Sequence, residues 1–149
     1  MMHAQYTLPG LRVSLADRSR RAVGALGERL AAGLLEKAGY VVSFTQPGQQ
    51  RGDLVAIQPG TGDMTFVEVK TARRGRDGKW RFTLRKRGCT DHRHADVVIL
   101  LAVLKSGRPV PFVVPVETLR HKNHAVITSH PENYSGKLAV YRQQGAIQL

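Results

Sequence analysis

Residues 53–70 read DLVAIQPGTGDMTFVEVK, two apolar-rich runs separated by a turn of Pro, Gly, Thr and Asp. The runs at 53–58 and 64–71 are typical of β-strands, and the turn between them is typical of a β-hairpin. Strand residues two apart project from the same face, so Glu68 and Lys70 share one face of the second strand. That pattern is unusual, because burying a charge is costly unless it is paired or binds a metal.

The hairpin predicts which carboxylates meet. If the turn is centred between Gly60 and Thr61, residues that face one another have numbers that sum to 121, and Asp53 faces Glu68. Like charges directly opposite destabilise a sheet, so the pair needs a cation, and a divalent metal with oxygen ligands would supply one. A bulge in the turn would shift this register by one residue and move the partners to opposite faces. The same register pairs Val55 with Phe66 and Ile57 with Met64.

Lys70 acquires a chemical role in such a site. An ammonium one strand step beyond a metal-binding carboxylate can hold a water for attack on phosphorus and stabilise charge on the phosphoryl oxygens. A divalent ion polarises a phosphodiester and lowers the pKa of water. The three residues are equally compatible with a cluster of charges on an exposed strand end, and residue types alone do not decide between the two interpretations.

Charge is the clearest compositional signal. The chain has 149 residues, 42% of them hydrophobic, and 23 Lys and Arg against 11 Asp and Glu, a net charge of +12. Ten of the basic residues lie between Lys70 and Arg93. This clustering favours binding of a nucleic acid over a merely soluble surface. Without an apolar leader or membrane span, and with a single cysteine, we expect a cytoplasmic protein that contacts no membrane.

The chain is expected to form one α/β domain around a mixed sheet, with residues 1–12 as a flexible N-terminal segment. A helix is predicted from Ser14 as N-cap, with Asp17 in the capping-box position, to a stop at Gly39. Gly24 and Gly27 weaken this helix and would allow close packing. A short helix is expected at 116–122 and a basic loop at 72–79. Strands are expected at 40–45, 53–58, 64–71, 80–85, 95–104, 110–116 (near an edge), 124–129 and 137–144.

The segment RGDLVAIQPGTGDMTFVEVK resembles the motif of the PD-(D/E)xK nuclease superfamily, in which an acidic residue, a hairpin-length spacer and E-x-K follow one another. The upstream GERLAAGLLEKAGYVV resembles the first helix of archaeal Holliday-junction-resolvase-type enzymes. HADVVILLAV, PFVVPVETLR and GKLAVYR are similar, more weakly, to homing-type endonucleases. The resemblance covers residues 22–142, and its specific part is 27–70. Gly52 stands where the family has Pro.

The resemblance implies a restriction-endonuclease-like core and a metal-dependent endonuclease acting on DNA, with Mg²⁺ or Mn²⁺ as cofactor. Asp53 and Glu68 would bind the metal with the backbone carbonyl of Val69, and Lys70 would position the attacking water. Glu28 would complete the catalytic set, by ordering Lys70 or a second hydrated metal. Periodicity alone assigns Glu28 to an ordinary solvated helix position, so its role rests on the resemblance.

Contacts to DNA are expected from a loop before the first carboxylate and from the basic segment after the lysine. One active site makes one cut, so a double-strand break predicts a homodimer. Junction resolvase, homing or restriction enzyme, repair nuclease, RNA as substrate and a non-catalytic binding module on the same fold remain open alternatives. The residues expected to bind nucleic acid are Gln50, Arg51, Arg73, Arg74, Arg76, Lys79, Arg85, Lys86 and Arg87.

Two other patterns carry less information. Cys89 and the neighbouring histidines lack the spacing of a structural zinc site. The loop 46–52 lacks the Gly-Lys-Ser/Thr end of a P-loop, so no nucleotide cofactor is expected. Asp96 opens a buried strand, where it either makes a strand-end turn contact or contributes to the site.

Overall fold

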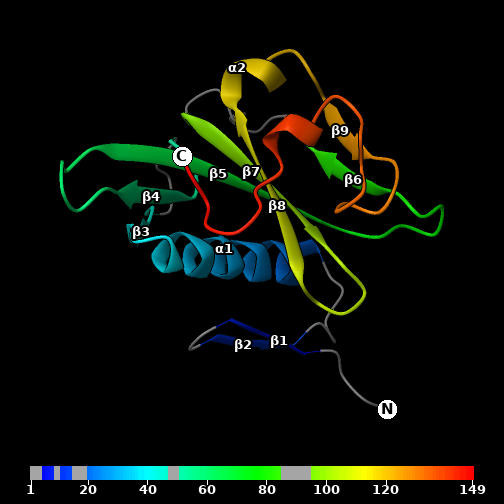
Figure 1. Ribbon diagram of the computed structural model, residues 1–149, viewed down its shortest axis with the longest axis horizontal. Helices are drawn as coiled ribbons and strands as arrows, with labels where there is room; N and C mark the ends of the chain where they lie inside the picture. The colour runs from blue at the N-terminus through cyan, green and yellow to red at the C-terminus, as the bar shows by residue number, and fades with distance from the viewer. Residues whose placement is uncertain (1–4, 9–10, 15–19, 47–50, 85–94) are drawn as a thin grey trace.

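A five-stranded mixed sheet forms the centre of the protein (Figure 1). The computed structural model describes residues 5–8, 11–14, 20–46, 51–84 and 95–149. The strand order is β3-β4-β5-β7-β8, with β5 and β7 parallel and the other neighbours antiparallel. The expected mixed α/β sheet is therefore confirmed. Its strands are β3 (Val41–Phe44), β4 (Leu54–Ile57), β5 (Met64–Arg73), β7 (Val97–Val103) and β8 (Pro109–Pro115).

The β4–β5 hairpin has the predicted register. Val55 pairs with Phe66 and Ile57 with Met64, and the last pair joins Leu54 to Val67. All of these numbers sum to 121. The paired strands stop one position short of Asp53, so that residue is placed by other contacts, described below.

Helix α1 (Arg20–Lys37) covers one face of the sheet and runs beneath β5 (Figure 1). Its buried side chains pack with Val67 and Val69 of β5 in one apolar cluster. A β-carbon added at Gly27 would lie 1.6 Å from the Thr71 Oγ1, so only glycine lets the helix approach the strand this closely. The helix ends at Lys37, just before the predicted stop residue Gly39, which has a φ of 99°.

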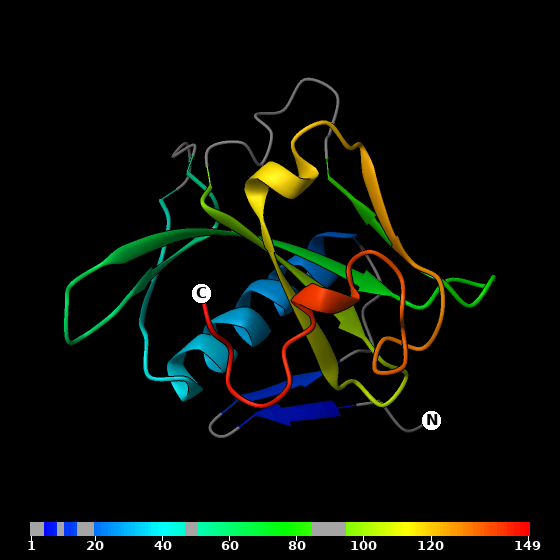
Figure 2. The same cartoon turned by 45° about the horizontal axis from the view of Figure 1, so that its top comes forward.

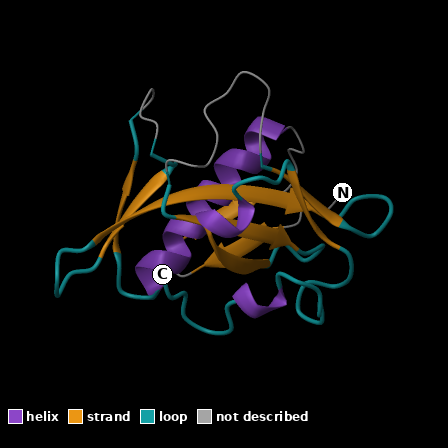
Figure 3. Ribbon diagram, turned by 90° about the horizontal axis from the view of Figure 1, so that it is seen from above, coloured by secondary structure: helices purple, strands orange, loops and turns teal. Residues whose placement is uncertain are grey.

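The opposite face of the sheet is covered by smaller elements (Figures 2 and 3). Alternate residues of β7 divide between the layers. Ile99 and Leu101 pack in the cluster with α1, whereas Val98 and Leu100 pack in a second cluster. The prediction that this strand is buried on both faces is confirmed. The elements over the second face are β6 (Trp80–Thr83), α2 (Val116–Leu119), β9 (His124–Ile127) and the 3₁₀ turn η2 (Ala139–Tyr141).

The predicted start of the first helix was wrong. Ser14 is not an N-cap, because it ends β2 (Leu11–Ser14), which pairs with β1 (Gln5–Leu8) in a separate two-stranded sheet. The alternating apolar residues on either side of a Pro-Gly pair were the missed hairpin signal. Asp17 lies outside the described residues.

Two predictions near the C-terminal half were also wrong. Segment 137–144 contains the turn η2 instead of a strand, because Leu138 is buried while Val140 is 78% exposed, a pattern that suits a tight turn against the core. The loop predicted at 72–79 is shorter, because β5 continues to Arg73. Beyond it, Gly75 donates a hydrogen bond to the Lys79 carbonyl (2.8 Å), which closes a turn.

None of the helices in the described part of the chain is long and apolar enough to cross a membrane.

Substituting Gly27 and Gly24 by alanine tests the close approach of α1 to β5. Gly27→Ala is expected to lower the free energy of unfolding by about 1–3 kcal/mol, because the stiff β-branched Thr71 cannot swing away from a new methyl group. A β-carbon at Gly24 meets nothing within 4 Å, so Gly24→Ala is expected to raise the free energy by about 0.5–1 kcal/mol. Urea unfolding measures both. Effects of the same sign would contradict this packing.

Candidate active site

Asp53 is held at the point where β4 begins. The preceding Gly52 has a φ of 88°, and a β-carbon there would lie 2.6 Å from the Val67 carbonyl oxygen, so this position requires glycine. The Asp53 N–H donates to that carbonyl (2.8 Å), and the Thr45 N–H donates to the Asp53 carbonyl (3.0 Å). The Asp53 Oδ2 accepts the Val69 N–H at 2.8 Å. The carboxylate thus replaces the strand partner that Val69 lacks beyond the end of β4.

Glu68 and Lys70 project from β5 away from α1, since the alternate residues Val67 and Val69 pack against the helix. The Lys70 Nζ lies 3.0 Å from the Glu68 Oε1. The Glu68 and Lys70 side chains are only 18% and 22% exposed. The unusual pair noted in the sequence is therefore a partly buried ion pair beside Asp53.

The pKa of Asp53 is raised by its surroundings. Burial, followed by the negative charges of Glu68 and Glu28, raises the pKa of Asp53 from 3.8 to about 6. The hydrogen bond from Val69 and the positive charge of Lys70 act in the opposite direction but do not offset the rise. Asp53 therefore sits where an ionised carboxylate lacks enough positive charge around it.

Glu28 extends this acidic region from α1. Burial raises its pKa, and the negative charge of Glu68 raises it further. Gly27, the preceding residue, is the point at which the helix touches β5. The close helix–strand contact therefore brings Glu28 into the electrostatic range of Glu68, although it lies off the apolar helix face. Three carboxylates and one lysine leave a local charge of −2 when all are ionised, within a chain of net charge +12.

The oxygen atoms here fit a hard divalent cation. The N–H and C=O of one strand residue point to the same edge, so the Val69 carbonyl points toward Asp53, as its N–H does. Carboxylate and carbonyl oxygens are ligands that Mg²⁺ and Mn²⁺ accept. Across the described residues, no three His, Cys, Asp or Glu side chains are grouped closely enough to bind a metal by themselves. A metal would thus depend on Asp53, Glu68 and this carbonyl together.

Three residues that sequence reasoning did not connect lie beside the site. The Arg51 guanidinium carbon lies 3.8 Å from the centre of the Phe66 ring. Its Nη2 is 3.9 Å from the Asp96 Oδ1. The Asp96 Oδ2 accepts the Phe66 N–H at 2.8 Å. Asp96 therefore contacts both the strand and the arginine, and only its position before a buried strand hinted at this in the sequence.

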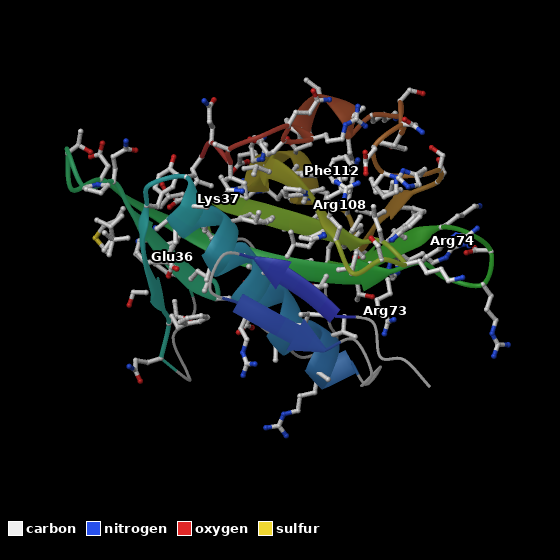
Figure 4. The ribbon with its side chains drawn as sticks, turned by 60° about the horizontal axis from the view of Figure 1, so that its bottom comes forward. Glu36, Lys37, Arg73, Arg74, Arg108 and Phe112 are labelled. Atoms are coloured by element: carbon white, nitrogen blue, oxygen red, sulfur yellow. The ribbon has the colours of Figure 1, made fainter. Side chains whose placement is uncertain are left out.

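Of the other predicted DNA-binding residues, four lie within the described part of the chain and four lie outside it. Arg73 and Arg74 lie at the end of β5, far from Glu36 and Lys37 at the C-terminal end of α1 (Figure 4). The exposed Arg76 and the half-buried Lys79 belong to the turn that follows. The structure therefore continues β5 from the candidate site into a basic hairpin. Gln50, Arg85, Lys86 and Arg87 lie outside the described residues, as does Cys89.

Comparison with known proteins identifies the architecture. No family model matches the chain, and no curated protein matches it. Among solved structures, the bacterial homing endonuclease I-Ssp6803I is similar with a TM-score of 0.63 and 18% sequence identity, over 83% of this chain and 87% of that one. The chain has a restriction-endonuclease-like fold. The fold that the resemblance in the sequence implies is thereby confirmed.

The raised pKa of Asp53 predicts how stability depends on pH in EDTA. The pKa of Asp53 is higher in the folded protein (about 6) than the ordinary value of 3.8, so its stabilising contribution is complete below about pH 4 and is lost as the pH rises through 6. Asp53→Asn keeps an acceptor for the Val69 N–H without the charge. At pH 8 the variant is expected to unfold with a free energy about 2–3 kcal/mol higher than the wild type.

The control is Asp63→Asn, at an exposed position in the β4–β5 turn. It is expected to leave the pH dependence of unfolding unchanged. Urea unfolding from pH 4 to 8 measures all three proteins. If the free energy of unfolding depended on pH in the same way for the wild type and Asp53→Asn, ionisation of Asp53 would not destabilise the folded state.

Proposed function

We propose that this protein is a metal-dependent endonuclease that hydrolyses phosphodiester bonds of DNA. The observation that carries the proposal is the cluster around Asp53, in which half-buried carboxylates just before β4, on β5 and on α1 have too little positive charge near them. Like charges placed this close together disfavour one another's ionised form. A divalent cation would neutralise the cluster. The restriction-endonuclease-like fold and the similarity to a homing endonuclease support the same class of activity.

Asp53, Glu68 and the Val69 carbonyl would hold Mg²⁺ or Mn²⁺ in this proposal. When bound, the ion would polarise the scissile phosphodiester and favour deprotonation of water. Asp53 reaches the site with its carboxylate already fixed by the Val69 N–H, so little ordering remains when the ion binds.

Lys70 would bind the attacking water and stabilise the charge that develops on the phosphoryl oxygens. Its ammonium is already held 3.0 Å from Glu68 in a partly buried setting. Glu28 would contribute a further negative charge near Glu68 and Asp53, where it would order Lys70 or a second hydrated metal.

The basic residues along and beyond β5 would bind backbone phosphates and so position DNA without reading its sequence. Arg51, Arg73, Arg74, Arg76 and Lys79 are the described members of this set. We also propose a homodimer, because two cuts in a duplex need two sites.

Lys70→Ala is expected to lower the cleavage rate by about 100- to 1,000-fold, because the charge that develops in the transition state loses its nearby donor. DNA affinity and its salt dependence should stay largely unchanged. Lys105→Ala removes the same charge from an exposed turn between β7 and β8 and serves as the control. Loss of both cleavage and binding in Lys70→Ala would mean that Lys70 supports the fold rather than the reaction.

The substrate can be determined with labelled nucleic acids under Mg²⁺, Mn²⁺ or EDTA. A four-way junction, a matched linear duplex, a single strand and an RNA duplex form the panel. Metal-dependent cutting of the junction alone would indicate a resolvase, and cutting of linear duplex at discrete positions a homing or restriction enzyme. Binding of every substrate without cleavage under any metal would instead support a non-catalytic binding module.

A further inference from the structure

Arg51 occupies a defined position on the sheet although its side chain is 57% exposed. The guanidinium lies over the Phe66 ring at 3.8 Å, a geometry in which the ring attracts the positive charge. Gly52, with its left-handed backbone, turns the chain between Arg51 and Asp53. Residues 51–53 therefore place both a carboxylate in the candidate site and an arginine beside it.

Asp96 holds this arrangement from the other side of β5. Its N–H donates to the Phe66 carbonyl (2.9 Å), and its Oδ2 accepts the Phe66 N–H (2.8 Å). Its Oδ1 faces the Arg51 Nη2 at 3.9 Å. The two carboxylate oxygens thus have separate tasks: one fixes the strand and the other orients the arginine.

Phe66 and Glu68 project from the same face of β5, two residues and about 7 Å apart. The guanidinium above Phe66 is therefore a neighbour of the candidate metal ligand, on the face of β5 that Lys70 also shares. An exposed arginine–carboxylate pair contributes little to stability, about 0–1 kcal/mol. A planar guanidinium is, in contrast, well suited to bind a phosphate through two N–H groups.

We propose that Asp96 and Phe66 are positioning residues that hold the Arg51 guanidinium against the backbone phosphate adjacent to the one being cleaved. This inference rests on the proposed function of the site. Its physical basis is that the stacked ring and the carboxylate restrict the arginine before DNA binds, so less side-chain entropy is lost in forming the contact. The arginine then fixes the DNA backbone relative to Glu68 and Lys70.

The test combines single-turnover cleavage with DNA binding measured by fluorescence anisotropy over a range of KCl concentrations. Arg51→Ala is expected to lower the cleavage rate at saturating enzyme by about 10- to 100-fold. It should also reduce the slope of log K against log salt by about 1, the loss of one phosphate contact. Asp96→Asn retains an acceptor for the Phe66 N–H, and a smaller loss of rate is expected.

The decisive comparison is the double variant Arg51→Ala/Asp96→Asn. If Asp96 acts through the arginine, the double variant cleaves no more slowly than Arg51→Ala alone. Multiplied losses would assign Asp96 an independent structural role and overturn the inference. Arg51→Lys should recover only part of the rate, because an ammonium cannot make the two-fold contact.

Arg120→Ala is the matched control, since Arg120 also pairs with an exposed carboxylate, Glu117, at 2.7 Å. It should leave the cleavage rate unchanged. If the wild type cleaves DNA and Arg51→Ala matches it in rate and salt slope, this inference fails while the nuclease proposal stands. If no substrate is cleaved but Arg51→Ala and Asp96→Asn both reduce the salt dependence of DNA binding, the phosphate contact stands and the nuclease proposal fails.

Discussion

The hydrogen bond from the Val69 N–H to the Asp53 carboxylate both completes the edge of β5 and positions a residue of the candidate site. β4 has no further strand residue to pair with β5 at this point, so a backbone donor would be left without a partner beside the core. The side chain of Asp53 accepts it at 2.8 Å. The hydrogen bond that completes the sheet therefore also places a carboxylate at the site, and the positive φ of Gly52 makes this turn of the chain possible.

A second aspartate acts on the same strand from its other edge. Asp96, placed just before β7, binds both backbone groups of Phe66. Asp53 and Asp96 thus flank the part of β5 that carries Glu68, one on the side of β4 and one on the side of β7. A strand held at both edges and packed on α1 through Val67 and Val69 presents its charged side chains with little freedom, which a preorganised site requires.

The candidate site has a negative local charge, whereas the chain as a whole has a net charge of +12. Basic residues dominate the chain, yet the cluster of Glu28, Asp53 and Glu68 is acidic and partly buried. When no metal is bound, this arrangement lowers the free energy of unfolding, because a carboxylate with a pKa raised to about 6 is still ionised at neutral pH. Such a cost is common where residues are selected for function rather than for stability.

The sequence by itself determined the local features. The turn residues at 59–63 and the apolar alternation on either side specified the β4–β5 register, because hairpin pairing depends on contacts between residues that are close in the chain. The same pattern placed Glu68 and Lys70 on one face. The glycine at 39 likewise marked the end of α1, since it supplies a backbone conformation that other residues resist.

Only the tertiary structure decided what converges on those residues. Asp53 leaves the strand pairing to bind Val69, and Glu28 approaches Glu68 only because Gly27 lets α1 contact Thr71. Asp96 meets Phe66, 30 residues away, through the parallel pairing of β5 with β7. The local propensities of the sequence do not predict these contacts between distant residues. They follow from how the helix and the strands stack, and that depends on the whole core packing at once.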